Sequence, residues 1–191
     1  MSSIRIFILS SFAENGPMHG HALRLWAERK HVNLWTNISV GAVYGAMKRL
    51  ASEGLLREVG REQEGNRPTR QIYEVTEEGH RALAALRREA LSEIWFKYDP
   101  FDVALARSDP NSADSLPDIL ADRLDRVQAL LEERKRTNEE ASEYISLAQE
   151  WALKHSEYRL EAEVAYLTDL LAAAPALVDD ARNPRPLKPK P

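Results

Sequence analysis

The stretch SVGAVYGAMKRLASEGLL, at residues 39–56, constrains the fold more than any other part of the chain. At about 100° per residue, one side of a helix here carries four apolar side chains: Val40, Val43, Met47 and Leu50. The opposite side is small or basic, with Tyr44 at its border: Gly41, Gly45, Lys48, Arg49 and Ser52. Two glycines inside a helix cost about 1 kcal/mol each relative to alanine. We therefore expect this face to approach another surface closely enough to offset that cost.

The sequence around this helix predicts three helices followed by a two-stranded ribbon. Apolar residues favour helices over 3–14, 19–30 and 39–53, with a turn at 15–20. Gly54 is placed to end the third helix in a left-handed conformation. Two alternating segments then flank a turn that holds Gly65, Asn66 and Pro68. Thr76 is placed to cap a fourth helix, which we expect to run until Pro100.

This order of elements is typical of a winged helix-turn-helix, whose third helix enters the DNA major groove while its wing touches flanking DNA. The expected DNA contacts lie on the third helix and in the ribbon: Ser39, Gly41, Tyr44, Gly45, Lys48, Arg49, Arg61, Arg67 and Arg70. A plainer interpretation also exists for these side chains. An arginine in a surface turn is usually only solvated, and Tyr44 is also compatible with a partly buried core position.

Three segments resemble the hallmark motifs of the PadR family of transcriptional regulators: GPMHGHAL (16–23), SVGAVYGAMKRLASEGLL (39–56) and GNRPTRQIYEVTEEG (65–79). The resemblance covers roughly residues 4–83 and implies a winged helix-turn-helix repressor that works as a homodimer. The sequence departs from the family pattern at three positions. His21 stands where the family usually has tyrosine, Gly45 where proline is common, and Val75 where leucine is usual.

The second half of the chain predicts a helical dimerisation domain. Residues 99–115 form a proline-containing connector, and helices are expected over 116–138 and 142–174. Both helices carry apolar seams that require partners, and the candidate interface residues are Leu120, Leu124, Val127, Leu131, Tyr144, Leu147, Trp151 and Tyr158. The region also resembles the larger C-terminal helical domain of one PadR subgroup, which implies dimerisation. The predicted domains are thus residues 1–98, the connector, residues 116–178 and a disordered proline-rich tail at 179–191.

An aromatic group lies where the two predicted halves meet. In some PadR relatives, small aromatic molecules bind in this neighbourhood, so Trp95, Phe96 and Phe101 are candidates to line a pocket for a flat apolar effector. The alternative is that these rings fill the core of a hinge. Trp151 and Tyr158 have the same two interpretations, as interface core or as pocket.

Composition excludes several classes of protein. The chain has no cysteine, which removes disulfides and thiol chemistry and agrees with a reducing compartment. We find no apolar run long enough to span a membrane and no signal peptide, and we expect a cytoplasmic protein. The sequence contains no glycine-rich phosphate loop, HExxH or GxSxG motif, so we expect neither an enzyme nor a bound cofactor or metal.

The charge distribution points to a focused anionic partner. The chain has a net charge of −4, yet residues 1–82 carry 11 Lys or Arg against 9 Asp or Glu, while residues 83–191 carry 15 against 21. Residues 29–52 carry four basic side chains and no acidic one, which in an acidic protein suggests a focused anionic partner such as nucleic acid. The alternative is that so small a cluster arises by chance. The acidic total also leaves open a winged helix that binds another protein. The sequence as a whole predicts a mainly α-helical chain: a winged helix-turn-helix followed by an antiparallel helical dimerisation domain.

Overall fold

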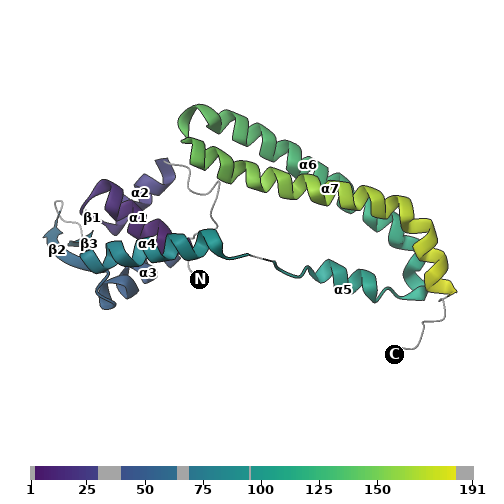
Figure 1. Cartoon of the computed structure of the whole chain (residues 1–191), viewed down its shortest axis with the longest axis horizontal. Coiled ribbons are helices and arrows are strands. Elements are labelled where there is room, and N and C mark those ends of the chain that lie inside the picture. Colours follow the sequence, from purple (N-terminus) through teal and green to yellow (C-terminus); the bar gives the residue numbers. More distant parts are fainter. Residues whose placement is uncertain (1–2, 30–39, 64–68, 95, 184–191) are drawn as a thin grey trace. The chain divides into compact units, whose positions relative to one another are not determined.

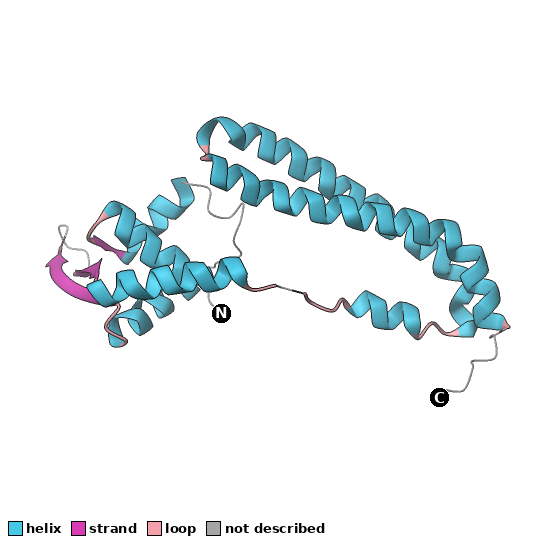
Figure 2. Ribbon diagram, viewed as in Figure 1, coloured by secondary structure: helices cyan, strands magenta, loops and turns pink. Residues whose placement is uncertain are grey.

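The structure is a computed structural model that describes residues 3–29, 40–63, 69–94 and 96–183 (Figure 1). The chain is mainly helical with one small antiparallel sheet (Figure 2), which confirms the predicted fold class. It divides into two compact units at residues 95 and 96. Among the described helices, none is both long and apolar enough to cross a membrane.

The N-terminal unit has the predicted helices and ribbon, plus one short strand. Its elements are α1 (Ser3–Asn15), β1 (Met18–His19), α2 (Gly20–Arg29), α3 (Val40–Ser52), β2 (Leu56–Glu62), β3 (Arg70–Val75) and α4 (Glu77–Ser92). Helix α1 is the centre of this unit, because it packs against α3, α4 and β3. The buried core comes from five of these elements and the turn after α3: Ile8, Leu9, Phe12, Leu23, Val43, Ala46, Met47, Leu50, Leu55, Leu56 and Leu83.

The junction between α3 and the ribbon is fixed by close backbone contacts. Gly54 has a φ of 76°, the left-handed conformation that the sequence predicts at this helix end. Thr76 accepts a hydrogen bond from the Gly79 N–H at 3.0 Å and donates its own hydroxyl to the Gly54 carbonyl at 2.7 Å. A Cβ atom on Gly79 would lie 2.2 Å from the Leu55 carbonyl oxygen, so only glycine allows α4 to start here. The predicted Thr76 cap is confirmed, and it joins α4 to the end of α3.

Strand β1 was not expected, because residues 15–20 have the composition of a turn. Met18 and His19 pair with Tyr73 and Ile72 of β3, which makes the sheet order β1-β3-β2. This pairing places the start of α2 at the edge of the ribbon. It therefore brings the residues around His19 close to the face that the sequence assigns to DNA.

The C-terminal unit is built on an antiparallel pair of long helices, α6 (Leu116–Ala141) and α7 (Leu147–Arg182), which lie side by side in Figure 1. A short helix α5 (Pro100–Ala106) and two 3₁₀ turns, η2 (Pro110–Ser115) and η3 (Ser142–Tyr144), complete it. One core cluster of this unit centres on Leu120, Leu167 and Ala174. Ser146 and Gln149 form a reciprocal capping box at the start of α7.

Three predicted boundaries are wrong. Helix α4 ends at Ser92 and does not reach Pro100, and the connector at 99–115 is largely helical. The last helix begins at Leu147, after a separate 3₁₀ turn, and it continues through Pro175 to Arg182. Residues 179–182 are therefore helical, although we predicted a tail from residue 179; the rest of that tail, at 184–191, lies outside the described residues.

Candidate nucleic-acid interface

Helix α3 separates its apolar and its small or basic residues onto two faces. Val43, Met47 and Leu50 are buried in the core, whereas Gly41, Lys48 and Arg49 are exposed. Tyr44 lies at the border with 41% of its surface exposed, and Gly45 is half-buried. The sequence predicts this division correctly, because the buried residues recur with helical spacing.

The two glycines on the outer face of α3 are not required by contacts among the described residues. A Cβ atom on Gly41 would meet nothing within 4 Å, and one on Gly45 would meet only the Arg49 guanidinium, at an ordinary 3.8 Å. Neither residue has the positive φ that requires glycine. Each nevertheless lowers helix stability relative to alanine. No contact among the described residues therefore explains why glycine stands at these two positions.

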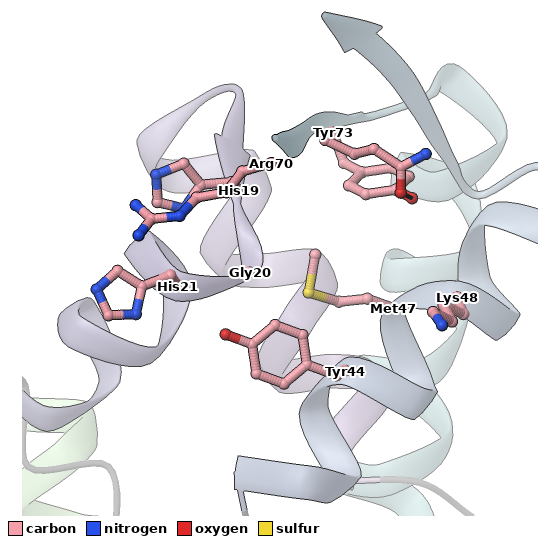
Figure 3. A pocket seen from close by; sticks show the side chains of 9 residues that line it. His19, Gly20, His21, Tyr44, Met47, Lys48, Arg70 and Tyr73 are labelled. Atoms are coloured by element: carbon pink, nitrogen blue, oxygen red, sulfur yellow. Dashed lines mark hydrogen bonds between the residues drawn. The ribbon is translucent and has the colours of Figure 1, made fainter. Parts of the chain in front are cut away.

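A hollow of about 190 Å³ opens beside this face, between α2, α3 and β3 (Figure 3); we call it the α2–α3–β3 hollow. Nine of the described residues line it: His19, Gly20, His21, Tyr44, Met47, Lys48, Arg70, Gln71 and Tyr73. None of these nine carries a carboxylate. Figure 3 shows the Arg70 guanidinium, the His21 ring and the Tyr44 hydroxyl on one side of the hollow, with Lys48 on the other.

His19 has a structural role at the start of α2. Its Nδ1 atom accepts a hydrogen bond from the Ala22 N–H at 2.9 Å and so caps the helix. Nδ1 must then be unprotonated, which places the ring hydrogen on Nε2, 3.6 Å from a Glu62 carboxylate oxygen on β2. The sequence contains no signal that His19, His21, Gln71 and Tyr73 share one hollow.

The arginines of the ribbon differ in their surroundings. Arg61 donates to Glu58 at 2.8 Å, and this hydrogen bond raises the pKa of the Arg61 guanidinium. Arg57 pairs with Glu74 across the two strands. Arg70 is half-buried and lines the hollow. Ser39 and Arg67, which we also predicted to contact DNA, lie outside the described residues.

Phe96 and Phe101, the described members of the predicted aromatic group, do not line a common pocket. Phe96 is 80% exposed and meets Tyr98 edge-on, with ring centroids 5.5 Å apart. Phe101 instead packs under the Arg123 guanidinium, whose Cζ lies 4.2 Å from the ring centroid, and edge-on against Tyr166. Trp95 lies outside the described residues.

The eight candidate interface residues of the C-terminal unit divide into two groups. Four of them lie on α6. Leu120 and Leu131 are buried within this single chain, and Leu124 and Val127 are half-buried. We had assigned these four to a contact between chains, but the α6–α7 hairpin already covers Leu120 and Leu131. The other four remain exposed: Tyr144 (81%), Leu147 (70%), Trp151 (57%) and Tyr158 (60%).

Comparison with known proteins agrees with the geometry of the N-terminal unit. Residues 8–85 match the transcriptional regulator PadR-like family. This part of the chain is a PadR-like family domain. The matched range contains α2, α3 and the whole ribbon, so it includes every described residue of the candidate interface. Among curated proteins, none matches the chain in sequence.

Solved structures share the fold over nearly the whole chain. Bacillus subtilis PadR in complex with operator DNA has a TM-score of 0.67 at 18% identity, over 91% of this chain and 98% of that one. Bacillus subtilis PadR in complex with p-coumaric acid has a TM-score of 0.66 at 17% identity, over 90% and 98%. The PadR-like transcriptional regulator BC1756 from Bacillus cereus has a TM-score of 0.58 at 17% identity, over 91% and 99%. At these identities the likeness establishes the fold.

Proposed function

We propose that this PadR-like chain is a sequence-specific DNA-binding transcriptional regulator, and that α3 enters the major groove with its glycine-containing face toward the bases. The observation that carries the proposal is that a Cβ atom would meet nothing within 4 Å at Gly41 and only the Arg49 guanidinium, at 3.8 Å, at Gly45. Side chains there would hold base edges away from the helix, whereas glycines let the backbone approach. Lys48 and Arg49 on the same face supply cations for phosphates or guanines.

We propose further that the chain acts as a homodimer. Tyr144, Leu147, Trp151 and Tyr158 present large apolar side chains to solvent in a single chain. Leu147, Trp151 and Tyr158 recur at helical spacing along α7 and so share one face, and an exposed apolar face is typical of an interaction surface. A two-fold dimer presents two recognition helices to half-sites about one helical turn apart, so the operator is expected to be a near-palindrome.

We also propose that the regulator is a repressor released by a small aromatic effector. The support is the fold shared with Bacillus subtilis PadR, whose structures include one with operator DNA and one with p-coumaric acid. For this chain, Trp95 and Phe96 are the candidate effector contacts. Phe101 is already engaged by Arg123 and Tyr166. A function on genomic DNA also fits the cytoplasmic location that the composition predicts.

The proposal is tested by measuring binding to the DNA upstream of the gene that encodes the chain, at several salt concentrations. Groove binding with phosphate contacts gives an affinity that falls steeply as salt rises, and a preference over scrambled DNA of the same length. The rival function, a winged helix that binds protein, is favoured by the acidic total charge of the chain. It predicts no such preference at any salt concentration.

A further inference from the structure

The α2–α3–β3 hollow combines a cation, a neutral donor and a histidine without an acidic neighbour in its lining. Arg70, Tyr44 and His21 come from three different elements and lie on one side of the hollow in Figure 3. None of the nine described lining residues brings a negative charge, and the Glu62 carboxylate lies 3.6 Å from Nε2 of His19. Convergent donors without a carboxylate fit a tetrahedral anion, because each can donate a hydrogen bond to one of its oxygens.

The position of the hollow indicates where such an anion comes from. Tyr44 and Lys48 belong to both the hollow and the exposed border of α3. If α3 enters a groove, the hollow lies next to the DNA, where backbone phosphates are the available anions. We propose, on the basis of the proposed function, that this hollow binds one phosphate of the DNA backbone and that His21 does so in its protonated form.

His21, not His19, is the histidine that can take up a proton for this purpose. A proton on Nδ1 of His19 would break the hydrogen bond from the Ala22 N–H that caps α2. The His19 ring lies beside that of His21, with ring centroids 6.0 Å apart and ring planes at 25°. A histidine titrates near pH 6.5, so a phosphate beside His21 favours the charged ring within the physiological range.

Other charged groups among the described residues affect the protonation of His21. Lys48 and Arg70 oppose a third positive charge while the hollow is empty, and a bound phosphate removes that opposition. Tyr44 and Tyr73 are the other ionisable groups in the lining. Glu62 faces His19 from β2, and Arg24 of α2 is paired with Glu28 at 2.5 Å. DNA binding is thus coupled to proton uptake at His21.

The experiment measures the affinity of the full chain for its upstream DNA from pH 6.0 to 8.0 at constant ionic strength. We expect the wild type to bind about tenfold more tightly at pH 6.0 than at pH 7.5, which corresponds to an average uptake of about 0.7 proton over this range. His21→Gln removes this dependence, and His21→Arg keeps tight binding at every pH. His80→Gln, an exposed histidine on α4, is the matched control and retains the wild-type profile.

Calorimetry of the wild type in two buffers of different ionisation enthalpy measures the same proton uptake without any variant, which covers the case in which a His21 variant fails to fold. Binding that is independent of pH, or a pH dependence retained in His21→Gln, would overturn the role of His21. Absence of DNA binding at every pH would instead contradict the proposed function. About 10 mM inorganic phosphate, at matched ionic strength, should weaken DNA binding by wild type more than by His21→Gln, because free phosphate competes for the hollow that holds the DNA phosphate. Binding of free phosphate to the hollow, with equal DNA affinity for wild type and His21→Gln, would overturn the proposal.

Discussion

Gly20 lies directly against the ring of Tyr44: a Cβ atom on Gly20 would be 2.5 Å from Cε1 of that ring and 3.3 Å from the sulfur of Met47. The first residue of α2 therefore determines where the tyrosine of α3 points (Figure 3). Because Tyr44 borders the candidate DNA-reading face, this contact links the core of the N-terminal unit to its proposed function.

Gly20→Ala is expected to displace the Tyr44 ring and to lower the free energy of unfolding by about 1–2 kcal/mol, as overpacking does. DNA affinity should fall as well, because the hydroxyl of Tyr44 moves out of the hollow. Thermal unfolding and DNA binding measure the two effects. Gly41→Ala is the matched control for stability, since a Cβ atom there meets nothing within 4 Å. Equal melting temperatures for the two variants would contradict the account.

The Arg5–Glu53 ion pair, with contacts of 2.9 and 2.5 Å, ties α1 to the end of α3. The hydrogen bond from Arg5 lowers the pKa of Glu53 below its ordinary 4.5. A depressed carboxyl pKa contributes stability that is present above pH 4.5 and lost as the pH falls through the folded-state value. Glu53→Gln should therefore be less stable than wild type at pH 7 and should lose less stability between pH 5 and pH 3. Glu89→Gln, at an exposed position of α4, is the control and should show the wild-type dependence of the unfolding free energy on pH. If Glu53→Gln showed that same pH dependence, a stabilising Arg5–Glu53 ion pair would be contradicted.

Arg70 and Arg61 should differ as DNA contacts although both belong to the ribbon. Arg70→Ala is expected to weaken binding to all sequences and to reduce the slope of log affinity against log salt by about 1 per chain. Arg61→Ala should change the slope less, because its guanidinium is held by Glu58 at 2.8 Å. Salt titrations on operator and scrambled DNA measure both slopes. A larger loss for Arg61 would show that the hollow is not the phosphate-binding part of the ribbon.

Trp151→Ala should separate the proposed homodimer into monomers without unfolding the α6–α7 hairpin, because the side chain is more than half exposed in one chain. Leu153→Ala is the contrasting variant: Leu153 is 2% exposed, and its truncation should cost about 2–5 kcal/mol of stability. Sedimentation and thermal unfolding measure the two properties separately. A wild type that is monomeric at micromolar concentration would end the dimer proposal.

The sequence predicts elements whose signals are local. Helical spacing of Val43, Met47 and Leu50 defines the buried face of α3, and Gly54 and Thr76 mark its end and the start of α4 through their own backbone and hydroxyl chemistry. Strand β1 has no such signal, because two residues form a strand only through pairing with β3. The α2–α3–β3 hollow depends on that pairing and was not predicted for the same reason.

The end of α7 shows how tertiary contacts override a local rule. Proline inside a helix removes a hydrogen bond and usually ends or kinks it, so a stop at residue 174 was expected. The structure buries Ala174 completely beside Leu120 and Leu167, and Arg182 pairs with Asp114 of η2. These contacts on both sides of Pro175 favour continuation of the helix, and the sequence alone does not show that they form.

The glycine-containing face of α3 can be tested with one substitution, Gly45→Ala, measured for both unfolding and DNA binding. A Cβ atom at this position meets only Arg49, at 3.8 Å, so alanine should raise the free energy of unfolding by up to about 1 kcal/mol. If the face lies against base edges, the same methyl group should weaken operator binding at least tenfold, about 1.4 kcal/mol. A more stable variant that binds DNA more weakly is the predicted result. A more stable variant with unchanged operator affinity would contradict the claim that this face reads DNA.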